Sequence, residues 1–151
     1  MPTEIKFMDD TGIKHMLREE GLRLKPYLDT QGIPTISVGC TYYENGRKVK
    51  MSDPAISKER AISMFRTVLK HYELAVYSTT RDDINQNQFN ALVSTCYNIG
   101  VAGFKGSTLL KRVNAKASGE MIAKAFMMWT KNKELIPRRS REVELYFKPI
   151  Q

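Results

Sequence analysis

The chain has 151 residues, with 24 Lys or Arg against 16 Asp or Glu and a formal net charge of +8 at pH 7. A composition of 42% hydrophobic and 26% charged residues is that of an ordinary globular protein and excludes a disordered or fibrous chain. No apolar run approaches the roughly 20 residues that a membrane-spanning helix needs, so no integral membrane segment is expected.

The N-terminal residues 1–6, Met-Pro-Thr-Glu-Ile-Lys, lack the apolar core of a signal peptide, so export by the general secretory route is not expected. A basic surface favours anionic partners such as nucleic acids or bacterial walls. The basic residues are spread along the chain apart from Arg138-Arg139-Ser140-Arg141. Without a helix-turn-helix, zinc-finger or RNA-binding aromatic signature, a solvated basic face is favoured over a nucleic-acid partner.

Two cysteines cannot form a disulfide framework. Cys96 falls on an apolar helical face and reads as a small core residue, whereas Cys40 follows a predicted strand. A bridge between them is formally possible, but synthesis in a reducing cytoplasm argues against it. His15 and His71 lack the spacing of zinc ligands relative to the cysteines, so we predict no metal.

The first predicted helix covers about residues 10–20. Asp10 or Thr11 can cap its N-terminus, and its inward stripe reads Ile13, Met16, Leu17. At about 100° per residue, Glu20 lies about 60° from Leu17 within that stripe, and Glu19 points to the opposite face, into solvent. A carboxyl group among apolar side chains is desolvated, which favours the protonated form that a general acid needs.

Asp29 precedes a turn signal, Thr30-Gln31-Gly32, and a predicted strand over Pro34–Val38. A carboxylate at a solvated turn stays ionised, so Glu20 and Asp29 suit the acid and base roles of glycosidic hydrolysis. Thr35 returns on the strand and is placed to hold a water for the base. A structural interpretation fits equally well: Glu20 forms an ion pair at a buried helix end, and Asp29 shapes its turn.

The rest of the chain predicts one further hairpin followed by helices. Asn45-Gly46 predicts a turn within residues 41–50 that extends the small sheet. Ser57 caps a helix whose buried stripe is Ala61, Phe65, Leu69, Tyr72, Val76. Later helices are predicted over about 86–99, ending at Gly100, after Ser107, after Ser118 with Trp129 on its apolar face, and from Pro137.

Residues 20–40 resemble the catalytic segment of the phage-type lysozymes, the endolysins that open bacterial cell walls. The family pattern E-G-x-R-L-x-x-Y-x-D-x-x-G-x-x-T-I-G-x-G-H is matched at nearly every fixed position. The resemblance implies a general acid at Glu20, a second carboxylate at Asp29 and a catalytic threonine at Thr35. Ser37 stands in place of the usual glycine and Cys40 in place of the usual histidine.

The resemblance extends over roughly residues 12–147, through Gln88–Ser94, Asn98-Ile99-Gly100, Ser107–Leu110 and Arg138–Glu142, the last being similar to an R-R-x-x-E motif. It places Tyr97 and Ser107 where the family contacts the saccharide, and Arg139 where an arginine reaches the general acid and the bound substrate. Tyr97 also fits a surface aromatic and Ser107 a helix cap. Glu134 replaces a common glycine.

The resemblance implies a mostly helical α+β lysozyme fold in a single domain over residues 1–151. Its parts are an N-terminal lobe with a small β-hairpin sheet (12–57), a connecting helix (58–76) and a helical C-terminal lobe (82–148). The implied function is hydrolysis of the β-1,4 bond between N-acetylmuramic acid and N-acetylglucosamine in peptidoglycan, without a cofactor. We expect a monomer that stays in the host cytoplasm until a holin-type pore admits it to the wall.

Three alternatives follow from the same residues. A lytic transglycosylase cleaves the same bond but forms an anhydro product, and it works with a single glutamate. A silent wall-binding module would bind peptidoglycan without releasing reducing ends. A basic nucleic-acid binder would show salt-dependent binding.

Overall fold

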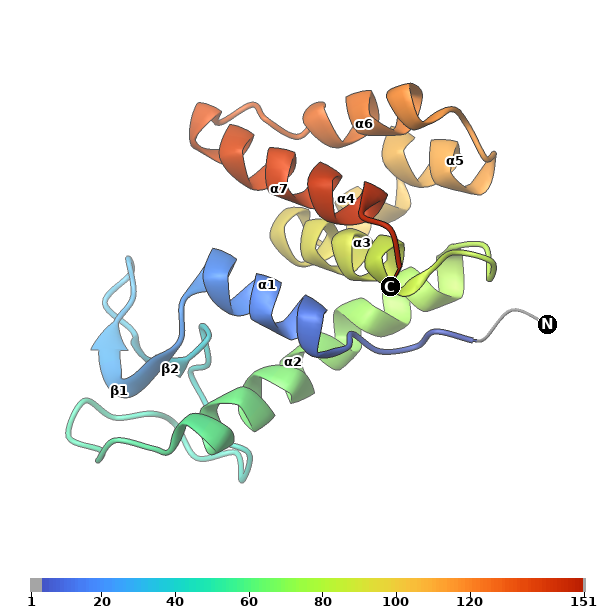
Figure 1. Cartoon of the computed structure of the whole chain (residues 1–151). Coiled ribbons are helices and arrows are strands. Elements are labelled where there is room, and N and C mark those ends of the chain that lie inside the picture. The colour runs from blue at the N-terminus through green and yellow to red at the C-terminus, as the bar shows by residue number, and fades with distance from the viewer. Residues whose placement is uncertain (1–3, 151) are drawn as a thin grey trace. The chain divides into compact units, whose positions relative to one another are not determined.

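The structure, a computed structural model, describes residues 4–150. These divide into two compact units. The hairpin unit is His15–Lys70, and the helical unit combines the chain before residue 15 with the chain after residue 70. Helix α1 (Asp10–Glu20) begins in the helical unit and ends in the hairpin unit, and α2 (Lys58–Thr79) runs the other way (Figure 1).

The sheet of the hairpin unit has two antiparallel strands, β1 (Arg23–Leu28) and β2 (Pro34–Ser37). Tyr27 pairs with Thr35 and Leu28 with Pro34, so the turn between the strands holds residues 29–33. One core cluster of this unit is formed by β2, the following loops and the start of α2: Ile36, Cys40, Tyr43, Val49, Ile56, Ala61, Met64. Strand β2 is therefore buried against the start of α2, whereas most of β1 is exposed.

The predicted turn at Asn45-Gly46 forms, but its hairpin does not extend the sheet. Gly46 has φ +84°, and Tyr43 N donates to Arg47 O at 2.9 Å. Beyond this turn, Tyr42 and Lys48 form only an isolated bridge, and the sheet keeps two strands within residues 4–150. The prediction fails because Tyr43 turns inward, 4% exposed, and its hydroxyl donates to Asp53 at 2.8 Å.

Ser37 explains one departure from the family pattern. Its φ is +60°, a region that glycine enters freely and other residues enter at a cost of about 1–2 kcal/mol. The side chain is fully buried, and its hydroxyl donates to the carbonyl of Ala61 in α2 at 2.7 Å. A hydrogen bond to the helix thus offsets the strain that glycine would avoid.

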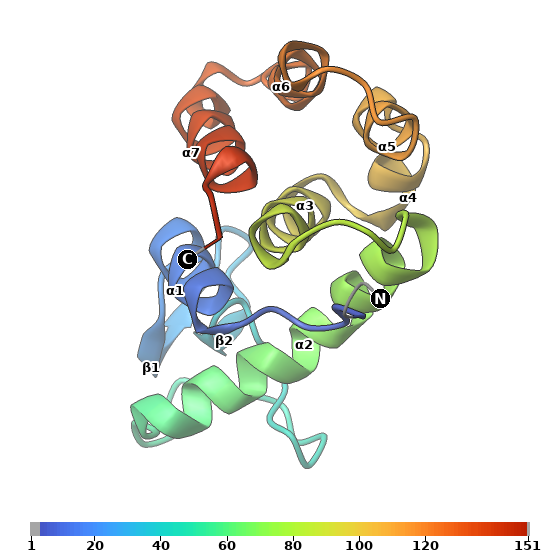
Figure 2. The same cartoon turned by 45° about the vertical axis from the view of Figure 1, so that its right-hand side comes forward.

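Helix α3 (Gln86–Ile99) is central to the helical unit and packs against α7 (Ile136–Phe147) and α4 (Val101–Lys105). Asn85 and Gln88 form a capping box at its start, and Gly100, with φ +90°, ends it. Helix α5 (Thr108–Asn114) contacts α6 (Gly119–Met127), and α6 contacts α7, so α4 to α7 curve around α3 (Figure 2).

The sequence predicted that Trp129 lies on the helix that begins after Ser118, and this prediction is wrong. The amide groups of Met128 and Trp129 donate to carbonyls three residues earlier, at 3.3 and 3.1 Å. This tighter hydrogen bonding ends α6 at Met127. Trp129 therefore begins the loop that leads through the short 3₁₀ turn η1 (Lys133–Leu135) into α7.

Both cysteines are free and buried. Burial raises the pKa of the Cys40 thiol and raises the pKa of the Cys96 thiol to about 12. Among the described residues no helix has the length and apolarity needed to cross a membrane.

Candidate active site

Asp29 is fixed by the turn between β1 and β2. Its Oδ1 accepts hydrogen bonds from the backbone N–H groups of Gln31 at 2.8 Å and Ile33 at 2.9 Å. Its own N–H donates to the Ile33 carbonyl at 3.0 Å. Two bonds to one oxygen leave the second carboxylate oxygen available to accept a proton.

Thr35 is held by the backbone of the same residue, Ile33. Thr35 is only 2% exposed, and its hydroxyl donates to the Ile33 carbonyl at 2.8 Å. The Ile33 backbone therefore joins Asp29 and Thr35. Because the hydroxyl proton is already donated, Thr35 can only accept a further hydrogen bond, from a water or a sugar hydroxyl.

Glu20 is the last residue of α1, and it is partly exposed in the same unit as Asp29 and Thr35. The N–H of Gly21 donates to Leu17 at 2.9 Å, and Gly21, with φ +78°, ends the helix. A Cβ at this glycine would meet nothing within 4 Å. Glycine is therefore required here by the backbone conformation and not by space.

Glu19 was predicted to point into solvent, and that prediction is wrong. Its side chain is 3% exposed, and its Oε2 lies 3.8 Å from Nε2 of His15, one turn earlier on α1. The two residues form an i,i+4 pair, which side-chain direction along a helix favours. Helical periodicity placed Glu19 opposite the first apolar stripe but did not reveal that this side of α1 is also covered.

The helical unit contains the three residues predicted to contact substrate, and all three have structural partners. Tyr97 is half-buried, with its ring edge-on to that of Tyr72 at 4.9 Å. Ser107 is 3% exposed; its hydroxyl accepts from Leu110 N at 3.0 Å and donates to Phe104 O at 2.7 Å. The cap therefore uses both functions of this hydroxyl group, and its role as a saccharide contact stays a prediction.

Arg139 is fully buried within a set of charged and polar groups that we call the glutamate cluster. Its members come from α3 and α7: Ser94, Thr95, Arg138, Arg139, Glu142. Each carboxylate oxygen of Glu142 accepts two hydrogen bonds. Oε2 accepts from Ser94 and Arg138 at 2.6 and 3.1 Å, and Oε1 accepts from Thr95 and Arg139 at 3.0 and 2.5 Å. The R-R-x-x-E spacing, which sets both arginines within one turn of the glutamate, is the signal that predicts this cluster.

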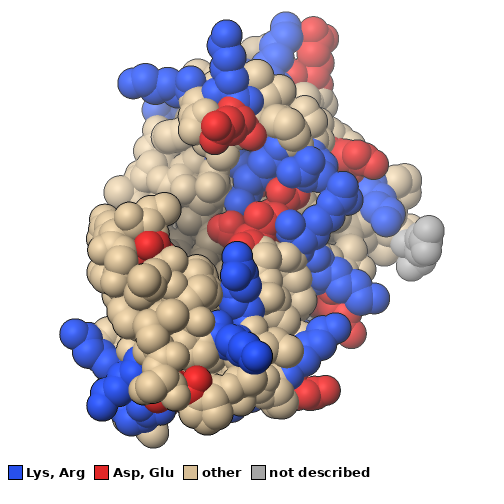
Figure 3. Space-filling model, turned by 90° about the vertical axis from the view of Figure 1, so that its left-hand side faces the viewer, with Lys and Arg blue, Asp and Glu red and all other residues tan. Residues whose placement is uncertain are grey.

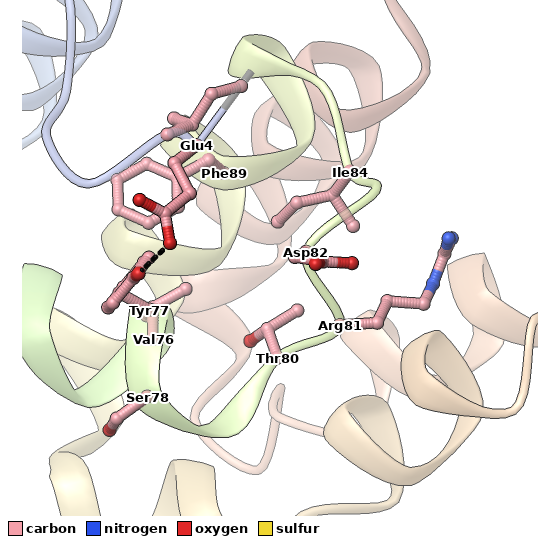
Figure 4. A pocket seen from close by; sticks show the side chains of 10 residues that line it. Glu4, Val76, Tyr77, Ser78, Thr80, Arg81, Asp82, Ile84 and Phe89 are labelled. Atoms are coloured by element: carbon pink, nitrogen blue, oxygen red, sulfur yellow. Dashed lines mark hydrogen bonds between the residues drawn. The ribbon is translucent and has the colours of Figure 1, made fainter. Parts of the chain in front are cut away.

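The helical unit also has a pocket of about 300 Å³ that contains none of the predicted site residues. The hydroxyl of Tyr77 donates to Glu4 on one side, and Arg81 points away from that pair (Figure 4). The Thr80 hydroxyl is buried and has no hydrogen-bond partner among residues 4–150. Sequence analysis did not anticipate this pocket, because its lining comes from the N-terminal segment and the α2–α3 connection.

Charge on the surface is mixed. On the face shown in Figure 3, most of the surface is uncharged, and Lys and Arg side chains gather over parts of it with Asp and Glu among them. No group of three or more His, Cys, Asp or Glu able to hold a metal ion occurs in residues 4–150. The two carboxyl groups and the threonine that the resemblance places in the active site, Glu20, Asp29 and Thr35, all lie in the hairpin unit.

A mostly helical fold with a two-stranded hairpin, carrying a glutamate at the end of α1 and an Asp–Thr pair on the hairpin, defines a glycoside hydrolase of the lysozyme class. A profile of the phage lysozyme family matches residues 17–142. The chain belongs to this family.

Relatives and solved structures agree. The chain is 41% identical over 143 residues to the endolysin of Salmonella phage P22, covering 92% of this chain and 97% of that protein. A crystal structure of a P22 lysozyme mutant is 38% identical, with a TM-score of 0.86 over 95% of this chain and all of that one. The muramidase domain of SpmX from Asticcacaulis excentricus is 30% identical, with a TM-score of 0.76 over 96% of this chain and all of that domain. The protein is an endolysin-type enzyme.

Proposed function

We propose that the protein cleaves the β-1,4 bond between N-acetylmuramic acid and N-acetylglucosamine in peptidoglycan, with Glu20 as the general acid. Glu20 protonates the oxygen of the leaving sugar. Asp29 and Thr35 act on the other side of the bond. The observation that carries this proposal is the Ile33 backbone, whose N–H donates to the Asp29 carboxylate and whose carbonyl accepts from the Thr35 hydroxyl.

The hydrogen-bond functions of the pair suit a shared water. A water donates one hydrogen to the free oxygen of Asp29 and the other to the lone pairs of Thr35, whose own proton is held by Ile33. The water's oxygen then faces the anomeric carbon with its lone pairs, and Asp29 accepts the proton as the bond forms. In the alternative, Asp29 stabilises the developing oxocarbenium ion and Thr35 orients the sugar.

A turbidity assay on permeabilised Gram-negative cells tests the reaction, with product masses measured in parallel. Glu20→Gln should abolish lysis and leave the thermal transition in place. Products that carry the added water support hydrolysis, and anhydro products, lighter by one water, would show a lytic transglycosylase instead. Binding to walls without any release of reducing ends would leave only a wall-binding module.

A kinetic double-mutant cycle tests the shared water. Asp29→Asn combined with Thr35→Val should cost little more than the worse single change, because groups that act as a unit are non-additive. Thr35→Glu fills the water position with a carboxylate, and it should stop turnover and trap a glycosyl-enzyme. Fully additive losses would assign Asp29 to electrostatic stabilisation alone.

The cellular setting is part of the proposal. Endolysin relatives support an enzyme that acts on the cell wall, and we expect a monomer that stays in the host cytoplasm until a holin-type pore gives access. Relatives named SAR-endolysins, from Pseudomonas phage phiKMV and Escherichia phage Mu, make the route worth testing. Lysis that requires co-expression of a pore-forming partner supports it, and lysis by the endolysin alone contradicts it.

A further inference from the structure

The turn at Asn45-Gly46 in the hairpin unit has features that neither the catalytic residues nor the family motifs use. It is the only Asn-Gly sequence in the chain, and both residues are exposed. Gly46 has φ +84°, and a Cβ at this position would meet nothing within 4 Å. The backbone nitrogen of Gly46 therefore has no side chain of its own to hinder its approach to the amide carbon of Asn45.

Asparagine is among the thermolabile residues, because its side-chain amide can react with the next backbone nitrogen. We propose that Asn45 is a site of spontaneous deamidation, with water as the co-reactant. The Gly46 nitrogen attacks Cγ of Asn45, the Cγ–Nδ2 bond breaks, and ammonia leaves with the proton of the Gly46 N–H. Water then opens the cyclic imide at either carbonyl and returns a proton to the nitrogen. The product is aspartate, or isoaspartate in which the chain runs through the former side chain.

Two hydrogen bonds of the closed turn act on this reaction in opposite directions. Arg47 N donates to Oδ1 of Asn45 at 2.9 Å and draws electron density from Cγ, the atom that is attacked. Gly46 N donates to the Tyr43 carbonyl at 2.9 Å, which holds the proton that has to leave. Because this second bond must break before the nitrogen can attack, the reaction requires local opening of the turn.

Opening of the turn is controlled by Tyr43. This residue is 4% exposed, and its hydroxyl donates to Oδ2 of Asp53 at 2.8 Å. Arg47 donates to Oδ1 of the same carboxylate at 3.2 Å, and its guanidinium carbon lies 4.6 Å from the centre of the Tyr43 ring. The residues on both sides of Asn45-Gly46 are therefore anchored at Asp53. The rate of deamidation should follow the stability of this anchor.

The other six asparagines of the chain are less suited to the reaction. They lie within helices or at the caps of α3 and η1: Asn85, Asn87, Asn90, Asn98, Asn114, Asn132. Each is followed by a residue whose side chain hinders the attacking nitrogen. For those within α3 and α5, the following nitrogen also takes part in helical or capping hydrogen bonds. Asn45 should therefore react first.

The reaction changes both the geometry and the charge of the turn. Isoaspartate adds one atom to the backbone before Gly46, so the modified turn should lose the hydrogen bond from Tyr43 N to Arg47 O. Both products add a negative charge. None of the residues assigned to glycoside cleavage lies in this turn, so the inference does not depend on the proposed function.

Peptide mapping by mass spectrometry tests the site, on the full chain kept folded at mildly alkaline pH. Aspartate and isoaspartate at position 45 should appear before deamidation at any other asparagine, and they should form faster in urea. Asn45→Ser is the control, because serine keeps a short oxygen acceptor for Arg47 N but cannot lose ammonia. No product at position 45 in the folded chain, or an earlier reaction at another asparagine, would overturn the proposal.

Tyr43→Phe tests the control by the anchor, because it removes the hydroxyl and keeps the ring beside Arg47. Loss of one hydrogen bond raises the population of the open turn about five-fold, and deamidation of Asn45 should accelerate by that factor. Tyr42→Phe is the matched control: this neighbouring tyrosine is 52% exposed, and the rate should not change. In urea the three chains should react equally fast. Equal rates in the two folded variants, or the same acceleration at every asparagine, would contradict local opening.

Discussion

Two clusters of charged side chains, one in each unit, are built in opposite ways. The glutamate cluster of the helical unit is buried, with Arg139 and Glu142 fully excluded from solvent. The hairpin unit has what we call the tyrosine cluster, at the surface: Tyr43, Glu44, Arg47, Asp53, Arg60. In it, Arg47 and Arg60 lie over the Tyr43 ring, with guanidinium carbons 4.6 and 5.1 Å from its centre.

The difference shows what burial does to an ion pair. In the glutamate cluster, the two carboxylate oxygens accept four hydrogen bonds, which compensate for the loss of water. In the tyrosine cluster, the pair Arg60–Glu44 has side chains 45% and 49% exposed, so water competes for both partners. Any single substitution in the glutamate cluster should therefore strongly lower the free energy of unfolding. A single substitution in the tyrosine cluster should lower it only by the contribution of the residue removed.

The largest effect is expected from Glu142→Gln. This change leaves two buried guanidinium groups without their counter-charge, and breaking such a set costs about 3–5 kcal/mol of unfolding free energy. Urea unfolding measures it, with the exposed Glu144→Gln on the same helix as a control that should stay within about 0.5 kcal/mol. A loss below about 1 kcal/mol would mean that the buried cluster is no more sensitive than the exposed one.

Ser37 extends the comparison to a buried neutral group in the hairpin unit. Ser37→Ala keeps the positive φ and loses the bond to Ala61, so we expect a loss of about 1–3 kcal/mol in unfolding free energy. Ser37→Gly loses the same bond but relieves the backbone, by about 1 kcal/mol. Thermal or urea unfolding should therefore rank wild type above glycine above alanine, and an alanine variant equal to the glycine variant would remove the strain argument.

Asp53 gives the tyrosine cluster a pH dependence. The backbone N–H of Lys50, the Tyr43 hydroxyl and Arg47 hold the pKa of Asp53 below its ordinary value of 3.8. Since the pKa in the folded state is the lower one, the stabilisation is present above pH 3.8 and is lost as the pH falls through the folded value. Asp53→Asn should therefore flatten the stability profile below about pH 4, with a loss at neutral pH less than half that of Glu142→Gln.

The smallest effect is expected from Arg60→Ala. Its ion pair with Glu44 is exposed, so the loss should be below that of Asp53→Asn and should shrink further in 1 M salt, where the Debye length is about 3 Å. Urea unfolding of Arg60→Ala and of Glu142→Gln, each at low salt and in 1 M salt, compares how strongly salt changes the two losses of stability. A salt effect as large in the buried cluster as in the exposed one would contradict the assignment of the two environments.

Much of the fold was predictable because local signals and burial agree. The Asn45-Gly46 turn and the Gly100 stop after α3 depend on positive φ angles at glycine, and the Ser107 cap depends on a side-chain hydroxyl that accepts from Leu110 N. In each case the residue type identifies the local structure. The Asp29–Thr35 arrangement also follows from a local signal, since a five-residue turn brings both side chains to the backbone of Ile33.

Other features depend on contacts that no local pattern contains. Glu19 is covered although periodicity assigns it to solvent, because a second side of α1 is packed. The position of Trp129 in a loop depends on where α6 ends. That end is set by hydrogen bonds from Met128 and Trp129 to carbonyls three residues earlier, and not by a proline or glycine. The resemblance named the residue types at these positions, but it did not give their burial.

The state of the two thiols bears on the proposed route, in which the protein is made in one redox environment and works in another. Cys40 and Cys96 are each buried in a different unit, and the raised pKa values keep the thiolate, the form that reacts with disulfides, scarce. The folded enzyme therefore offers an oxidising compartment no reactive thiol. On the route proposed above it would reach the wall without mixed disulfides or cross-linked dimers.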